Sequence, residues 1–190
     1  MAHKVLFPAA VVVLTIFIGI LLTTHEPEEE PPTESTKPER ADYFLANFEI
    51  HYHDKKGELR SILRGDHAEH FPVSQVIKVA TPRWQAQSKD GANWLAKAPR
   101  GSFKRASQTI HLHGDVNIRR RADAARPQLE INTRELLIDA EAGQALTDEQ
   151  VVATTPQGSA QGIGMTLDYY ADRLQLHNQA KGRYEFEQAN

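Results

Sequence analysis

Two pairs of histidines come closest to a reactive site in the type and spacing of their residues. They are His51 with His53, and His111 with His113. Residues two positions apart project from the same face of a β-strand, so each pair would place two imidazoles side by side. Zinc takes three or four such ligands, and Glu49 or Asp54 could complete a shell around the first pair.

The residues between the histidines favour a plainer interpretation. Apolar side chains alternate with the imidazoles, and these are Ile50, Tyr52, Ile110 and Leu112. If the apolar side chains face a core, the histidines face solvent. The sequence therefore predicts no metal site. A metal-dependent β-fold enzyme is kept as a less favoured hypothesis.

Other catalytic signatures are missing from the sequence. It contains no Gly-x-Ser-x-Gly, His-Glu-x-x-His or Gly-x-x-x-x-Gly-Lys motif, and no cysteine for thiol or disulfide chemistry. Gly162-Ile163-Gly164 lacks the third glycine of a dinucleotide fingerprint and predicts a backbone bend. Arg119 to Arg121 with Arg126 could bind lipid phosphates, but a charged edge or turn is the commoner explanation. We predict no catalytic residue and no cofactor.

The elements that would position these side chains are short strands. Apolar and polar residues alternate along 47–53 and 110–113, which indicates half-buried strands and an all-β fold. A strand is favoured over a helix for 133–146, and a loop for 121–130, where Pro127 would stop a helix. Turn signals separate the strands at 54–57, 65–66, 89–91, 114–115, 141–143 and 157–158.

A weak internal repeat predicts an elongated stack of strands. The stretch 109–118 resembles 173–184 when Leu112-His113 is laid on Leu176-His177, an offset of 64 residues. Gly114 of the first copy is replaced by Asn178 in the second, which still tolerates positive φ. The domain has only two Trp, so we expect a narrow groove as its interior.

The chain of 190 residues divides into three segments. Residues 1–24 are predicted to be a short cytoplasmic N-terminus and a transmembrane helix, because 5–22 are uncharged and would span about 27 Å. Residues 25–40 are rich in Pro and Glu and predict an extended tether. Residues 41–190 form the outer domain, whose formal charges cancel, which makes nucleic acid an improbable partner.

The order of these features resembles the LptC family, the bitopic inner-membrane subunit of the lipopolysaccharide export machinery. The resemblance spans the anchor, the tether and the β domain. It is carried by the hairpin at 54–57, Val79-Ala80-Thr81-Pro82, Leu112-His113-Gly114-Asp115-Val116, the Gly-x-Gly-Met at 162–165 and the closing stretch 174–185.

The resemblance implies a periplasmic, open β-jellyroll of about fifteen antiparallel strands shaped like a twisted boat. It implies that the interior holds lipopolysaccharide acyl chains, and that the partners are the transmembrane subunits of an ABC transporter and a soluble periplasmic bridge protein. The expected lipid-lining residues are Phe48, Ile50, Tyr52, Val79, Ile110, Leu112, Leu174 and Leu176. The expected docking edge is formed by Lys181, Tyr184, Glu185 and Phe186.

The resemblance implies no catalysis, so the favoured function is a lipid conduit. The alternative is a membrane-tethered scaffold that uses the same strand edges to assemble envelope proteins but carries no lipid. Retained strand pairing without lipid capture would favour this scaffold.

Overall fold

A computed structural model describes residues 38–184 of the chain, and the described residues from Glu39 onward belong to one compact unit. Within this range no helix has the length and hydrophobicity that a membrane crossing needs. The predicted anchor and nearly all of the predicted tether lie outside the described residues.

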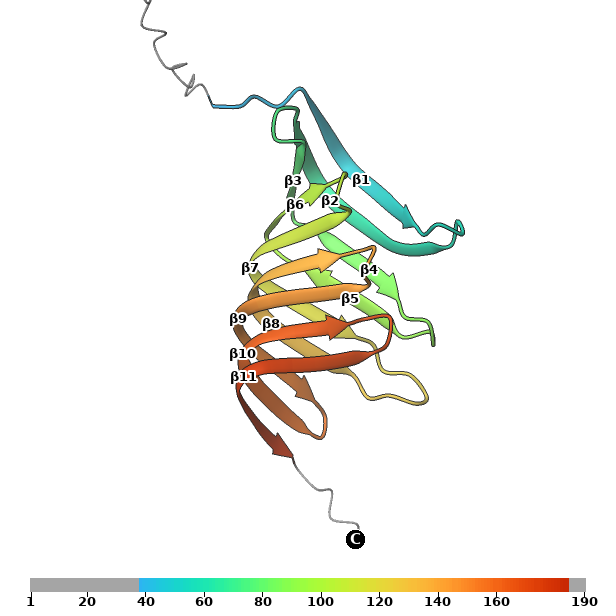
Figure 1. Cartoon of the computed structure of the whole chain (residues 1–190), viewed down its shortest axis with the longest axis vertical. Helices are drawn as coiled ribbons and strands as arrows, with labels where there is room; N and C mark the ends of the chain where they lie inside the picture. Colours follow the sequence, from blue (N-terminus) through green and yellow to red (C-terminus); the bar gives the residue numbers. More distant parts are fainter. Residues whose placement is uncertain (1–37, 185–190) are drawn as a thin grey trace, which may run out of the picture. The chain divides into compact units, whose positions relative to one another are not determined.

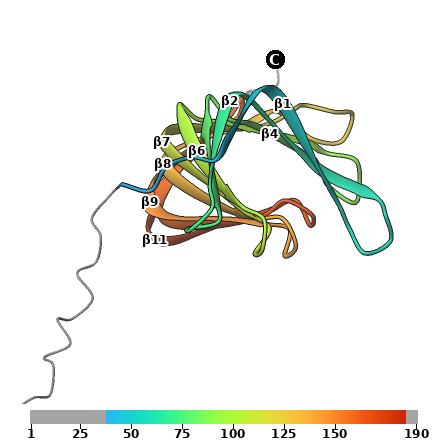
Figure 2. The ribbon, with the colours of Figure 1, turned by 90° about the horizontal axis from the view of Figure 1, so that it is seen from above.

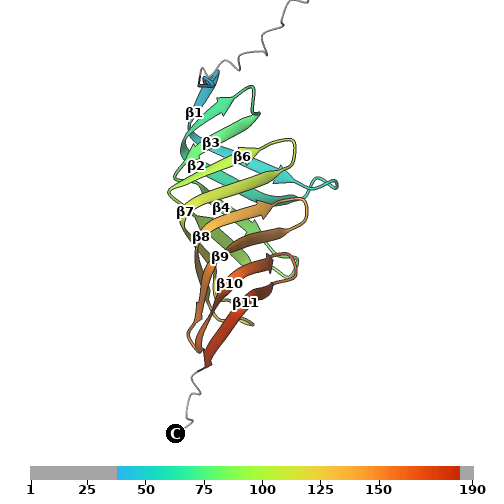
Figure 3. The same cartoon turned by 60° about the vertical axis from the view of Figure 1, so that its left-hand side comes forward.

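The described residues form eleven antiparallel strands in one sheet, which confirms the all-β prediction (Figure 1). The strands are β1 (Tyr43–His53), β2 (Leu59–Phe71), β3 (Val76–Ala80), β4 (Arg83–Gln87), β5 (Asn93–Lys97), β6 (Arg100–Lys104), β7 (Thr109–Arg120), β8 (Leu129–Asp139), β9 (Gln144–Thr155), β10 (Gly158–Asp168) and β11 (Arg173–Tyr184). Figure 3 shows them stacked from β1 at one end to β11 at the other.

Two facing layers arise because the sheet splits between β2 and β7. In layer one, the end of β2 continues through β3 and β6 to the start of β7. In layer two, the start of β2 continues through β4 and β5 to the end of β7. The long strands run through both layers, and Figure 2 shows them turning from one layer into the other along one side of the stack.

The bend between the layers coincides with irregular backbone in the long strands. Asn47, Gly114, Gly164 and Gln179 have positive φ, and register breaks accompany them in β7, β8, β9 and β10. A β-bulge bends a strand and increases its twist, so each strand changes direction without ending. In β11 the positive φ falls on Gln179 and not on Asn178, the residue that the repeat suggested.

The eleven strands differ from the expected number of about fifteen because the long strands cross the bend unbroken. The same feature makes two turn predictions wrong, since 65–66 and 114–115 lie inside β2 and β7. A Cβ on Gly65 would come within 2.6 Å of Val79 and 2.7 Å of Phe48. The glycine there serves close packing and not a turn.

The remaining local predictions are confirmed. Turns lie at 54–57, 89–91, 141–143 and 156–157, and the segment 121–128 is a loop. The stretch 133–139 belongs to strand β8, so the strand interpretation holds over the helical one. Gly162 to Gly164 bend β10, as the paired glycines predicted.

Candidate functional site

The space between the two layers is a continuous apolar interior. Seven of the eight expected lipid-lining residues belong to its cluster of packed side chains: Phe48, Ile50, Val79, Ile110, Leu112, Leu174 and Leu176. Tyr52 lies on the same face of β1 but is not part of the cluster, and burial raises the pKa of its hydroxyl. Strand alternation therefore located the inner face correctly along β1, β7 and the first half of β11.

Side chains fill the middle of this interior. Trp84, Trp94 and Tyr169 are at most 1% exposed, and the ring of Trp84 meets that of Tyr169 edge to face at 4.9 Å between centroids. Trp84 comes from layer two, whereas Tyr169 follows β10 in layer one. Close packing of this kind leaves little room for a ligand unless the layers separate.

A set of contacts that we call the clasp joins the layers at their open side. Arg120, at the end of β7, donates two hydrogen bonds to Asp172 in the β10–β11 turn, at 2.8 and 2.7 Å. Both side chains are 12% exposed. The Trp84–Tyr169 contact joins β4 of layer two to the same turn and completes the clasp. Both hydrogen bonds come from Nη1 of Arg120, and Arg126 lies 3.6 Å from the same carboxylate, so the clasp holds the β10–β11 turn against layer two.

Both ends of the stack present an open strand edge. Within the described residues β1 pairs only with β2, and β11 pairs only with β10. Leu174 and Leu176 are half-buried, while the second half of β11 is exposed throughout. Unpaired edges of this kind accept an added strand from another chain.

The inner face beside the second half of β11 is hollow. A depression of about 330 Å³ is lined there by Ala153, Ala160, Gly182 and Tyr184, among others. Its floor consists of small residues. The interior is therefore filled by large side chains in the middle of the stack and open at the β11 end. Tyr184 is 63% exposed.

The predicted docking residues lie on opposite faces of β11. Tyr184 lines the inner depression, whereas Lys181 lines a depression with Asp148, Glu149 and Gln161. Glu185 and Phe186 lie outside the described residues. Lys181 and Tyr184, the two predicted docking residues that the structure describes, therefore do not form one side-chain patch. They share only the edge strand β11.

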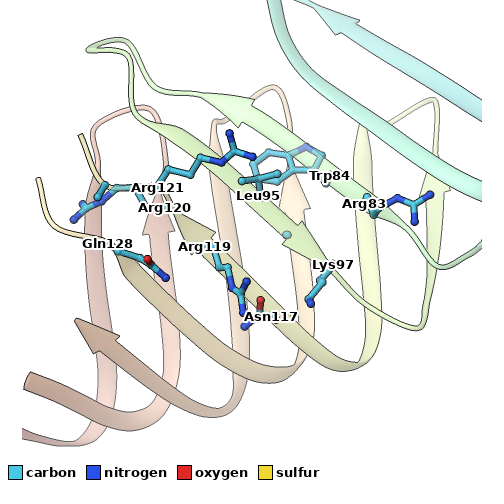
Figure 4. Close-up of a pocket in the computed structure, with 11 residues that line it drawn as sticks. Arg83, Trp84, Leu95, Lys97, Asn117, Arg119, Arg120, Arg121 and Gln128 are labelled. Carbon is cyan, nitrogen blue, oxygen red and sulfur yellow. The ribbon is translucent and has the colours of Figure 1, made fainter. Parts of the chain in front are cut away.

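The arginine run lies beside a basic depression of about 410 Å³ on layer two. Figure 4 shows Lys97, Asn117 and Arg119 gathered on neighbouring strands there. Arg119 lies 3.3 Å from Glu130. Arg126 lies 2.6 Å from Asp90 and from Asp123, and this contact with Arg126 holds the pKa of Asp123 below its ordinary value. Carboxylates of the chain itself thus pair with much of this basic run, as the charged-turn interpretation expected.

The sequence reasoning missed most of the residues that fill the interior. They include Leu63, Trp84, Trp94, Ile118, Ile131, Val151, Met165, Leu167 and Tyr169. A signal existed, because Trp84 alternates with Ala86 and Trp94 with Ala96, as inward residues of a strand do. Tyr169 lies just beyond the end of β10 but continues the alternation of Met165 and Leu167, so the same signal could have assigned it to the core.

The fold and the site define an open, two-layered β-protein with an apolar interior and two free strand edges. The chain matches the family described as "Lipopolysaccharide-assembly, LptC-related" over residues 9–185. It therefore belongs to the LptC family and takes part in lipopolysaccharide transport. No curated protein matches the chain.

Proposed function

We propose that this protein is a non-enzymatic conduit, which receives lipopolysaccharide from an inner-membrane ABC transporter and passes it to a periplasmic bridge protein. The observation that carries the proposal is the apolar inner face, which extends from Phe48 and Ile50 on one open edge to Leu174 and Leu176 on the other. In this proposal residues 1–24 anchor the chain in the inner membrane with the N-terminus in the cytoplasm, and the two layers form the open β-jellyroll of the family.

The hydrophobic effect explains why a conduit is needed. Burying one methylene is worth about 0.8 kcal/mol, so a chain of twelve to fourteen carbons is worth on the order of 10 kcal/mol. Exposure of several such chains to water would be prohibitive. An apolar surface along the path exchanges one apolar environment for another, and the ATPase then supplies only the difference.

The open edges support the handover step. An added strand gains backbone hydrogen bonds along the whole edge and requires little side-chain specificity. In the proposal β1 joins the jellyroll of a transporter subunit, and β11 joins the bridge protein. The hollow inner face beside Gly182 would then continue into the next module.

One observation favours the scaffold alternative, because the middle of the interior is already filled by Trp84 and Trp94. A scaffold needs only the edges, whereas a conduit also requires the layers to separate. The two functions therefore differ in whether lipid reaches the inner face.

Site-specific photo-crosslinking in the reconstituted transporter separates the two functions. Ile110 is only 4% exposed, so a bulky crosslinker there would disturb the core. Ile50 and Leu176 lie on the same inner face at the open edges, where a replacement is accommodated. Their matched controls are His51 and His177, the next residue on each strand, which project to the other face.

The conduit predicts ATP-dependent lipopolysaccharide adducts at 50 and 176, with few at 51 and 177. Equal adducts on both faces, or adducts at none of the four positions while both partners still co-purify, would contradict it. The second of these results would establish the scaffold.

A further inference from the structure

Three potential metal ligands meet on the outer face of layer one. His111 and His113 project from β7, opposite the buried Ile110 and Leu112. Glu135 is the register partner of His113 on β8. Among the described residues, these three form the one group of His, Cys, Asp and Glu side chains that lie close enough together to hold a metal ion. All of their ligand atoms lie within 4.8 Å of one another.

The distances approach those of a zinc shell. Glu135 Oε2 lies 2.7 Å from His113 Nδ1 and 3.4 Å from His111 Nε2. Zinc holds N and O ligands at about 2.0–2.2 Å in a tetrahedron, so its ligand atoms lie about 3.3–3.6 Å apart. The His111–Glu135 distance already fits this spacing. The His113–Glu135 distance reaches it after a small side-chain rotation.

Two further carboxylates line a depression beside these ligands. A depression of about 430 Å³ is lined by His111 and Glu135 together with Asp148 and Glu149. Lys104 is a nearby cation, and its charge acts against metal binding.

The other histidine pair shows what prevents such a site. His51 Nε2 lies 2.5 Å from Glu49, so one imidazole and a carboxylate are again adjacent. However, Arg64 donates hydrogen bonds of 2.9 and 3.1 Å to the two oxygens of Glu49, and a guanidinium therefore already occupies the carboxylate. The rings of His51 and His53 are 6.1 Å apart, compared with 4.2 Å for His111 and His113.

We propose that His111, His113 and Glu135 bind a divalent transition metal of the zinc class, which ties β7 to β8 at the bend. The site lies directly before Gly114, where the register of β7 and β8 breaks. A metal ligated from both strands would fix their pairing at the point where the ladder is interrupted. This role is structural, and it does not depend on lipid binding.

Calorimetric titration with zinc chloride alone tests the proposal on the untagged full-length chain in detergent, after treatment with a chelator. We expect one zinc ion per chain and a rise in Tm with zinc concentration, because an ion that binds only the folded state stabilises it. Glu135→Gln, which keeps the shape of the side chain, should weaken binding about 10–100-fold or more. His113→Ala should do the same.

The matched control is His51→Ala with His53→Ala, which should leave zinc affinity unchanged. Cobalt should report the geometry, since a tetrahedral site gives intense visible absorption that Glu135→Gln would remove. Zinc binding that is equal in the wild type and in Glu135→Gln and His113→Ala variants with native circular dichroism would overturn the proposal, as would the absence of binding in the wild type. Loss of binding only in the β1 control would place the metal elsewhere.

Discussion

The first and last strands of the sheet are both open edges, but they are held in different ways. β1 is held by large side chains, since Phe48 and Ile50 pack into the core and Glu49 pairs with Arg64 on β2. β11 is held at its start, through Leu174, Leu176 and the clasp. Its second half has only small or exposed side chains over the backbone ladder.

β1 is therefore a packed edge, whose inward side chains lie in the core, and the second half of β11 is a plain edge without such packing. A packed edge fixes the register of the strand, because each inward side chain occupies its own place. A plain edge leaves the main-chain groups as its principal feature, which suits addition of a strand with little sequence specificity. If side chains hold β1 and the clasp holds β11, the two edges should respond differently to substitution and to acid.

The largest expected difference comes from the same substitution, glycine to alanine, made near each edge: at Gly65 on β2, beside β1, and at Gly182 on β11 itself. Gly65→Ala should lower the free energy of unfolding by about 2–3 kcal/mol, because its Cβ would overlap Val79 and the ring of Phe48. Gly182→Ala should change it by less than about 0.5 kcal/mol, since the nearest atom to its Cβ would be Ser159 O at 3.8 Å. Denaturant unfolding of the full chain in detergent, followed by fluorescence of the two tryptophans, measures both.

Adding Phe48→Leu to Gly65→Ala should restore part of the lost stability, because the shorter side chain relieves the overlap. Equal effects of the two glycine substitutions would show that β1 is not held by close packing.

A smaller loss is expected when the clasp is broken. Asp172→Asn removes the charge but keeps the size of the side chain, and Asn tolerates the positive φ of 53° at this position. Leaving Arg120 half-buried without its partner should cost about 2 kcal/mol. Glu141→Gln is the matched control, because Lys55 and Glu141 also join two turns but are 94% and 65% exposed, which predicts less than about 0.5 kcal/mol.

The same unfolding measurement applies to both substitutions, and amide exchange then shows where the loss falls. In Asp172→Asn the increase in amide exchange over the wild type should be concentrated in the β10–β11 turn and the start of β11. An increase spread evenly over the sheet would mean that the clasp does not secure this edge in particular.

The smallest effect concerns acidification. Hydrogen bonds from Arg64 and His51 hold the pKa of Glu49 below its ordinary value of 4.5, and His70 does the same for Asp42, whose ordinary value is 3.8. A carboxyl group with a lowered folded-state pKa stabilises the fold above its unfolded pKa, and this stabilisation is lost as the pH falls through the folded value. β11 itself contains no Asp or Glu, and the clasp carboxylate of Asp172 acts only at its start.

Amide exchange, corrected for its intrinsic pH dependence, should therefore increase in β1 before it increases in the second half of β11 as the pH falls below about 4.5. Glu49→Gln should reduce this response of β1. If both edges lose protection together, the acidic contacts of β1 do not distinguish it from β11.

The sequence predicted the fold class and the inner face because both depend on local alternation. It placed Ile110 and Leu112 inward and His111 and His113 outward, as the structure has them. It failed at Gly65 and Gly114, because a glycine suits a turn, a bulge or a close approach equally well. The choice between these depends on neighbouring strands, such as the approach of Phe48 to Gly65.

Long-range register was the other missing information. Glu135 follows His113 by 22 residues, and only the pairing of β7 with β8 brings the two together. Asp172 follows Arg120 by 52 residues and reaches it across the open side of the layers. Neither contact has a local signature, so the candidate metal ligands and the clasp could be recognised only in the folded chain.

The bulges along the bend have a mechanical consequence. The irregular positions Asn47, Gly114, Gly164 and Gln179 follow the bend, so they form a hinge line between the two hydrogen-bonded layers. Rotation of the layers about this hinge line changes a few backbone torsion angles and leaves the strands within each layer hydrogen-bonded to one another. Resistance to widening then comes from the contacts across the open side, which are the clasp, the pairing of Asp172 with Arg126 and the hydrogen bond from Lys89 N–H to the carbonyl oxygen of Tyr170.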